Sequence, residues 1–267
     1  MPGEIRFDLS AEEYHAHAAV GSTTLKTIHA KTPAHARAQL DGPKEPTPAM
    51  RFGTALHTVL LEPDSVGRRI AVLPEGIDRR TKAGKADWDA FHAENAERQV
   101  VTADDWAKLK AIQASVRGNP LALALLRHGY AEPSIFWDDG DTGTACKCRP
   151  DWLNEAARVV VDLKSTQDAE PRAFERHAYA LGYHLQAAYY LDGVRELAFE
   201  PEAFVFVAVE KEPPYAVAFY QASASFLEAG RIAYRMALAT FAECEAKGEW
   251  PGYPAALQEL LLPPWAA

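Results

Sequence analysis

The chain has 267 residues, of which 48% are hydrophobic and 24% charged, and its formal net charge at pH 7 is −9. This composition is typical of a globular protein with one large domain or two small ones. Because the sequence has no run of 18 apolar residues and no signal peptide at residues 1–4, we expect no membrane association and a location in the bacterial cytoplasm. Three cysteines, Cys146 and Cys148 among them, argue against a disulfide framework and fit a reducing compartment.

The N-terminal half is predicted to be mainly helical. Ser22 is a candidate N-cap, and Pro33 divides residues 22–40 into two short helices. The remaining helices are predicted at 49–62, near 85–97, at 103–117 and at 119–127.

The C-terminal half alternates between strand and helix patterns. Strands are predicted at 131–137, 144–153, 158–164, 204–209 and 215–221, and long helices at 172–194 and 223–247. The order predicts an α/β fold with a mixed central β-sheet flanked by helices. We expect a single domain over 1–267, made of a helical part (14–130), a catalytic core (131–247) and an extended tail (248–267) that packs on a neighbour.

Two aspartates and a lysine are predicted to share one small patch. Asp162 and Lys164 alternate along a strand and therefore lie on one face, about 7 Å apart. A turn centred near residues 156–157 places Asp151 directly opposite Asp162, with Cβ atoms roughly 5 Å apart. Carboxylates this close repel each other unless a hard divalent cation lies between them, and such a cation beside a lysine suits phosphodiester hydrolysis.

The net charge weighs weakly against nucleic acid as a partner, because phosphate binding depends mainly on cations. Its distribution favours DNA more than the total does. The segment 68–85 is basic, and it includes Arg68, Arg69, Arg79, Arg80, Lys82 and Lys85. It predicts a lining for a DNA channel, with a solvated loop as the alternative.

The Pro150-Asp151 step and the Asp162-Leu163-Lys164 segment resemble the signature of the PD-(D/E)xK nuclease superfamily. The flanking motifs are similar to those of its RecB-like branch: Gly53 to His57 (GxxxH), Glu132 on the preceding strand, and Gln186 to Tyr190 (QxxxY). Over most of residues 14–240 the chain resembles the phage exodeoxyribonuclease VIII (RecE-type) and lambda-type exonucleases. The resemblance implies an αβββαβ core and a Mg²⁺-dependent exonuclease.

The resemblance also implies roles for individual residues. The implied metal ligands are His57, Glu132, Asp151, Asp162 and the backbone carbonyl of Leu163. Mg²⁺ is expected, and Mn²⁺ would suit the imidazole better. Lys164 is expected to assist the attacking water, Gln186 to orient Lys164 or a phosphate, and Tyr190 to bind a phosphate oxygen. For His57 taken alone, a core histidine is the alternative, and for Gln186 and Tyr190 it is ordinary packing.

Several basic and polar residues are predicted to contact DNA. Arg149 precedes Asp151 by two residues on the same strand face, which places its guanidinium near the scissile phosphate. The other candidates for phosphate contacts are Ser22, Arg51, Arg172, Lys147, Arg79, Arg80, Lys82 and Lys85. Cys146 and Cys148 point to the opposite face as packing residues, and three cysteines cannot hold the iron–sulfur cluster of some relatives.

The expected activity is processive digestion of linear double-stranded DNA from its ends, in the 5′ to 3′ direction, in a phage or prophage. By resemblance, the partner is a single-strand annealing protein of the Bet/RecT type. A closed homo-oligomeric ring would explain processivity, with a trimer favoured over a tetramer. The alternatives are a non-catalytic DNA-binding subunit and a structure-specific endonuclease.

Overall fold

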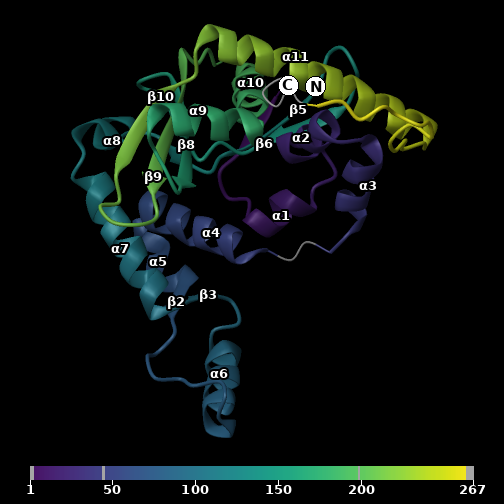
Figure 1. Cartoon of the computed structure of the whole chain (residues 1–267). Coiled ribbons are helices and arrows are strands. Elements are labelled where there is room, and N and C mark those ends of the chain that lie inside the picture. The colour runs from purple at the N-terminus through teal and green to yellow at the C-terminus, as the bar shows by residue number, and fades with distance from the viewer. Residues whose placement is uncertain (1–2, 44–45, 198, 263–267) are drawn as a thin grey trace.

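A computed structural model describes residues 3–43, 46–197 and 199–262. Its centre is a five-stranded mixed β-sheet, which confirms the predicted fold class (Figure 1). The parallel strands β8 (Val159–Thr166) and β9 (Ala203–Glu210) lie in the middle. β10 (Val217–Gln221) pairs antiparallel with β9, and β7 (Trp152–Asn154) followed by β4 (Tyr130–Ala131) extends the sheet on the side of β8.

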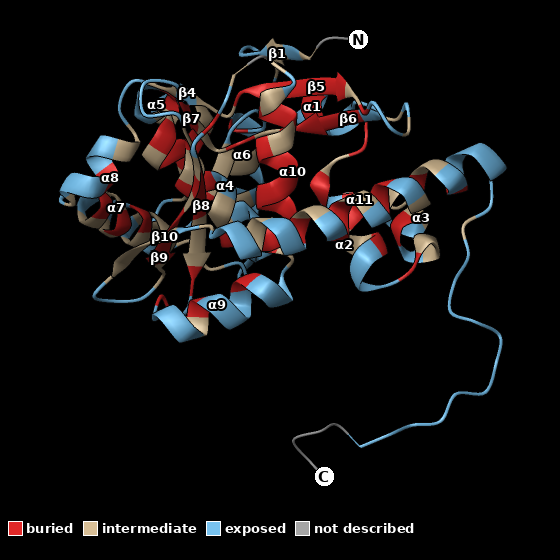
Figure 2. Cartoon of the chain, turned by 90° about the horizontal axis from the view of Figure 1, so that it is seen from above, coloured by how far each residue is buried: buried red, intermediate tan, exposed pale blue. Residues whose placement is uncertain are grey.

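Each face of the sheet supports its own hydrophobic core because side chains alternate along β8 and β9. Val160 and Phe206 lie in one core, whereas Val161, Leu163 and Val207 lie in the other. The first core is covered by α2 (Ser22–Ala30), α10 (Tyr183–Arg195) and α11 (Ala224–Lys247). The second is covered by α4 (Pro48–Leu61) and α7 (Ala103–Arg117). The buried residues of α10 and β8 are seen in Figure 2.

Two of the predicted strands are each broken in the middle. Residues 131–137 divide into β4 and β5 (Ser134–Asp138), and 144–153 into β6 (Ala145–Cys148) and β7. β5 and β6 leave the central sheet and form a second sheet with β1 (Glu4–Arg6). Pro133 and Pro150 stand at the two breaks, where proline cannot supply a ladder N–H. Two single strands were predicted, and the structure replaces them with one bent hairpin.

Two further predictions need correction. The predicted helix 172–194 is interrupted at Gly182, whose φ of +67° ends α9 (Pro171–Ala180) and begins α10. Ser22 is the first residue of α2, and Gly21 is its N-cap. The helices predicted at 49–62, 103–117 and 223–247 are confirmed within one residue at each end by α4, α7 and α11.

The remaining elements surround this core. They are α1 (Ala11–Ala16), α3 (Pro33–Asp41), a 3-10 turn (Pro63–Ser65), α5 (Val66–Arg69), β2 (Ile70–Val72), α6 (Lys82–Glu94), β3 (Gln99–Val101) and α8 (Pro120–Leu125).

The segment between β2 and β3 forms an arm that projects from the body (Figure 1). β2 and β3 pair in parallel at its base, and α6 lies at its far end. The basic segment predicted as a loop is therefore partly helical, because α6 begins at Lys82.

The described part of the tail leaves the body (Figure 2). Its first residues contact α3, where the Ala34 amide donates to the Pro251 carbonyl at 3.1 Å. Leu257 and Leu260 further on are fully exposed, and residues 263–267 of the predicted tail lie outside the described residues. Among the described helices, none has the length and apolarity needed to cross a membrane.

Candidate active site

The break between β6 and β7 opens the sheet edge beside β8. β7 pairs with β8 as far as Trp152 opposite Val161, so the next position places Asp151 opposite Asp162, as predicted. Asp151 Oδ2 accepts a hydrogen bond of 2.6 Å from the Leu163 amide. Because none of the described strands continues along this side of β8 beyond that point, side chains from both faces of the sheet can meet at Asp151.

His57 reaches this edge from α4 and meets two carboxylates there. Its Nδ1 atom lies 3.5 Å from Asp151 Oδ1 and 3.5 Å from Glu132 Oε1. Burial disfavours the charged imidazole, but the two carboxylates outweigh it and raise the pKa of His57 to about 9. Burial raises the pKa of Asp151 to about 7. The two carboxylates therefore favour the protonated, positively charged form of His57.

The Glu132 carboxylate is positioned by unusual backbone geometry. Glu132 is not part of a strand, and its φ of +46° lies in the left-handed region, which costs energy in a residue with a side chain. Its amide donates to the Asp151 carbonyl at 3.0 Å, which ties the two breaks of the hairpin together. The prediction that Glu132 lies on a strand is wrong, because the chain turns at this residue between β4 and β5.

Asp162 and Lys164 point to the face of the sheet that is covered by α10 and α2, whereas His57 comes from α4 on the other face. Asp162 is fully buried and forms an ion pair with the Lys164 amine. Its Oδ1 atom accepts a hydrogen bond of 2.8 Å from Gln186 Nε2. Burial opposes the charge of Lys164, but Asp162 and Asp151 outweigh it, so the pKa of Lys164 is raised. Gln186 thus holds Asp162, whereas the sequence predicted that it would orient Lys164 or a phosphate.

The donor set fits a hard divalent cation. Glu132, Asp151 and Asp162 provide carboxylate oxygens, and His57 provides an imidazole nitrogen that Mn²⁺ accepts better than Mg²⁺ does. In the described part of the chain, no three His, Cys, Asp or Glu side chains are arranged so that they could hold a metal ion without moving. The carboxylates instead contact His57 and Lys164. The carbonyl of Leu163 shares the edge with its amide, which is bound to Asp151.

Two predicted DNA contacts serve the fold instead. Lys147 is buried, and its amine donates to the carbonyls of Tyr14 and His17 at 2.7 Å each. Arg149 donates to the carbonyls of Glu132 (3.0 Å) and Leu9 (2.9 Å), with its side chain 15% exposed. These contacts tie both side chains to backbone carbonyls around the hairpin, whereas the sequence predicted that they would contact DNA. The Nη1 atom of Arg149 has no hydrogen-bond partner among the described residues.

The other predicted residues occupy three different settings. Tyr190 is buried beside Phe204, and burial raises its pKa well above the usual value. Ser22 is buried too, whereas Arg51 and Arg172 are exposed. The arm carries four exposed cations, and its helix α6 projects away from β8 (Figure 1): Arg79, Arg80, Lys82 and Lys85. Cys146 and Cys148 are buried packing residues, as predicted.

Comparison with known families gives a decisive match. The model of a family described as "PDDEXK-like domain of unknown function (DUF3799)" matches residues 21–259. This range includes the cluster of site residues: His57, Glu132, Asp151, Asp162 and Lys164. The chain belongs to this PDDEXK-like family. The family match supports nuclease activity in general.

One solved structure shows the same fold, and a second aligns more weakly. A protein named "Putative exonuclease" from Eubacterium rectale aligns with a TM-score of 0.64 and 13% identity, over 97% of this chain and 96% of that one. The structure of a protein named SSO0001 aligns with a TM-score of 0.36 and 13% identity, over 84% and 81% of the two chains. No curated protein matches the chain.

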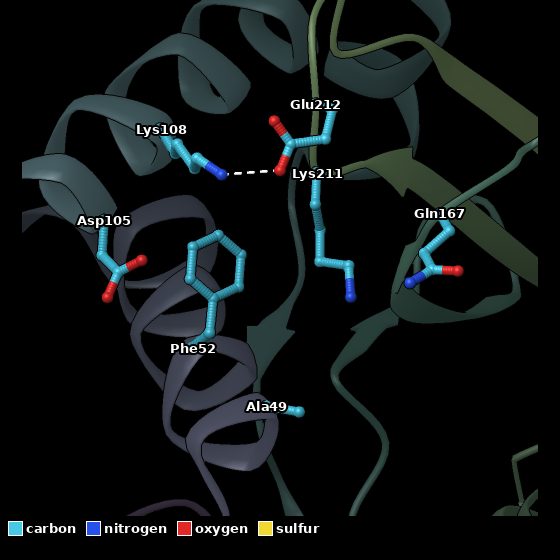
Figure 3. Close-up of a pocket in the computed structure, with 7 residues that line it drawn as sticks. All are labelled: Ala49, Phe52, Asp105, Lys108, Gln167, Lys211 and Glu212. Atoms are coloured by element: carbon cyan, nitrogen blue, oxygen red, sulfur yellow. Dashed lines mark hydrogen bonds and ion pairs between the residues drawn. The ribbon is translucent and has the colours of Figure 1, made fainter.

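A separate cavity of about 450 Å³ opens at the carboxyl ends of β8 and β9 (Figure 3). It is lined by Ala49, Phe52, Asp105, Lys108, Gln167, Lys211 and Glu212. Lys108 pairs with Glu212 at 2.6 Å, and the Lys211 side chain extends toward the space between Phe52 and Gln167. The lining of this cavity shares no residue with the group formed by His57, Glu132, Asp151, Asp162 and Lys164.

Lys26 and Tyr183 belong to the site but were missed in the sequence. Lys26 Nζ lies 3.3 Å from Gln186 Oε1, and burial lowers the pKa of this lysine to about 8. The Lys164 amine lies 4.6 Å from the centre of the Tyr183 ring. Tyr183 adjoins the QxxxY segment and could have been suspected there. Lys26 is 160 residues from its partner, and no local pattern indicates that contact.

Proposed function

We propose that this protein is a metal-dependent exonuclease that hydrolyses phosphodiester bonds of linear double-stranded DNA. The observation that carries the proposal is the meeting of His57, Glu132 and Asp151 at the open edge of β8, beside the Asp162–Lys164 pair. Carboxylates that surround a cation site next to a lysine are suited to attack by water on a phosphodiester.

Each residue of the cluster has a distinct task in this proposal. Glu132, Asp151, Asp162, His57 and the Leu163 carbonyl would hold Mg²⁺ or Mn²⁺. When bound, the metal supplies a more acidic water and neutralises phosphate charge. Lys164 would stabilise negative charge at the phosphate or orient the attacking water. Gln186 keeps Asp162 in one orientation through its 2.8 Å hydrogen bond.

The finer features rest on the resemblance to RecE-type and lambda-type exonucleases. We propose 5′ to 3′ polarity and delivery of 3′ single strands to an annealing protein of the Bet/RecT type in a phage or prophage. A closed ring would keep the enzyme on its DNA, and we propose a trimer in preference to a tetramer. Light scattering on the purified protein measures the molar mass of the assembly. A monomer at the concentrations used in the assay would contradict the proposed ring.

The decisive experiment compares a linear 5′-phosphorylated duplex with a closed circular duplex, in Mg²⁺, in Mn²⁺ and in EDTA. We expect metal-dependent loss of the linear substrate alone, and we expect Asp162→Ala to abolish it while DNA binding remains. Asp104→Ala, which removes an exposed carboxylate on α7, is the matched control and should retain activity. Equal cutting of the circle would favour an endonuclease instead.

The second candidate is a non-catalytic DNA-binding subunit. It predicts binding of linear duplex with no metal-dependent cleavage in any arm of the experiment. The intact set of acidic and basic residues at the cluster argues against it. His57 meets Glu132 and Asp151, and Asp162 contacts Lys164 and Gln186.

A further inference from the structure

Two lysines approach one aromatic ring beside Asp162. Lys164 Nζ lies 4.6 Å from the Tyr183 ring centre, and Lys26 Nζ lies 6.0 Å from it. Lys164 comes from β8 and Lys26 from α2, so two distant segments bring their cations to the same face of the sheet. Neither the motifs of the sequence nor the family match assigns a role to Lys26.

The position of Lys26 is fixed by its neighbours. A lysine amine has only donors, so the Gln186 amide must turn its oxygen to Lys26 and its NH₂ group to Asp162. The stem of Lys26 crosses the turn between α9 and α10 at Gly182. A Cβ atom added at Gly182 would lie 3.0 Å from the Cδ and Cγ atoms of Lys26. The lysine is therefore held in place before any ligand binds.

The two ammonium groups on this face have one carboxylate beside them. Asp162 forms an ion pair with Lys164, and among the described residues no carboxylate forms an ion pair with Lys26. The amine of Lys26 also has more donors than its hydrogen bond to Gln186 uses. An anion placed between the two lysines would therefore complete the charge balance of this face.

We propose that Lys26 and Lys164 together form a subsite for one backbone phosphate of the bound DNA strand, with Tyr183 as its floor. This subsite rests on the proposed function, because it presumes a phosphodiester substrate at the cluster. Lys26 acts on the substrate directly and also positions Gln186. Its loss weakens substrate binding more than it slows the bond-breaking step.

The binding test uses a short fluorescent 5′-phosphorylated duplex in EDTA, titrated at several salt concentrations. Removing one cation that binds a phosphate lowers the slope of log K against log salt by about 0.7 to 0.9 and weakens binding by about ten-fold or more. We expect this of Lys26→Ala and Lys26→Gln, with recovery in Lys26→Arg. Lys31→Ala, which removes an exposed lysine at the end of the same helix, should leave the slope unchanged.

The kinetic test uses the linear duplex with Mg²⁺. We expect Lys26→Gln to raise KM at least about ten-fold with a smaller change in kcat, and Lys26→Arg to restore most of the loss. If wild-type protein neither binds nor cuts DNA, the proposed function itself fails. If wild type cuts DNA and Lys26→Gln matches Lys31→Ala in KM and salt slope, the phosphate subsite is wrong. Because Lys26→Arg keeps the charge and Lys26→Gln keeps the bulk, a folding defect in Lys26→Ala leaves the test intact.

Discussion

At the scale of single residues, the site depends on ion pairs between oppositely charged side chains. His57 is the clearest example, since it offsets two carboxylates that burial would otherwise make costly. The sequence could identify His57, Asp151, Asp162 and Lys164 because they stand in motifs. It could not reveal Lys26, nor that Arg149 and Lys147 are tied to backbone carbonyls, because those contacts depend on the bend of a hairpin.

His57→Ala should weaken metal binding by at least about ten-fold, because it removes an imidazole that the two carboxylates orient. Isothermal titration with Mn²⁺ measures the affinity, and cleavage as a function of metal concentration measures the consequence. Excess metal should recover part of the activity. His29→Ala, an exposed histidine on α2, is the control, and equal affinities in the two variants would remove His57 from the metal site.

Gln186→Leu should destabilise the protein by about 1–3 kcal/mol, because the buried Asp162 oxygen loses the donor that satisfies it. Urea unfolding gives the free energy, and the linear-duplex assay should show reduced turnover in the same variant. Unchanged stability and activity together would mean that the Gln186–Asp162 bond is not formed in solution.

At the scale of elements, the bent hairpin and the corner between α9 and α10 determine where the site residues lie. Periodicity predicted the type of most helices and strands, because both cores impose a regular apolar pattern. It did not predict the breaks at Pro133, Pro150 and Gly182, because the apolar pattern continues across them. A strand that changes sheets keeps its alternation, so only the prolines and the glycine indicated where the chain turns.

Gly182→Ala tests the corner between α9 and α10. The alanine must adopt the backbone φ of +67°, and its methyl group must displace the Lys26 side chain. We therefore expect a loss of stability of about 1–2 kcal/mol or more, and weaker DNA binding. Gly248→Ala at the end of α11 is the matched control. It has a φ of +68° with open space around it and should show the backbone strain alone. Identical DNA binding in the two variants would mean that Gly182 does not position Lys26.

A second element contact links α10 to α11 and makes stability depend on pH. Asp192 accepts hydrogen bonds from Arg231 and Tyr234, and these outweigh its burial and lower its pKa. Its contribution is full above the unfolded pKa of about 3.9 and is lost as the pH falls through the lower folded value. Asp192→Asn should therefore reduce the unfolding free energy at neutral pH and flatten its decline in acid. Urea unfolding at a series of pH values from neutral to acid measures this unfolding free energy, with Asp104→Asn as the control.

At the scale of the whole molecule, an acidic protein has to present its cations selectively to bind DNA. The net charge is −9, yet the loop before α6 and the first turns of that helix carry exposed cations at Arg79, Arg80, Lys82 and Lys85. No acidic residue lies in the first turn of α6, where one would normally stabilise the helix dipole. Residues 79–85 are thus a short basic stretch on an arm that also carries Asp87, Asp89 and Glu94 further along α6. This stretch fits the DNA contact that the sequence predicted for its four cations.

Neutralising the arm should separate DNA capture from chemistry. The triple variant Arg80→Gln, Lys82→Gln and Lys85→Gln leaves both cores and the catalytic cluster untouched, so its Tm and its kcat at saturating DNA should match wild type. Its affinity for duplex should fall, and the slope of log K against log salt should drop by up to about 0.9 for each phosphate that the variant no longer binds. The control removes exposed cations from the body, as Lys31→Gln, Lys110→Gln and Arg117→Gln, with the same change in net charge. If both triple variants lose affinity equally, the arm acts only through net charge. If the arm variant alone changes the salt slope, DNA lies against α6.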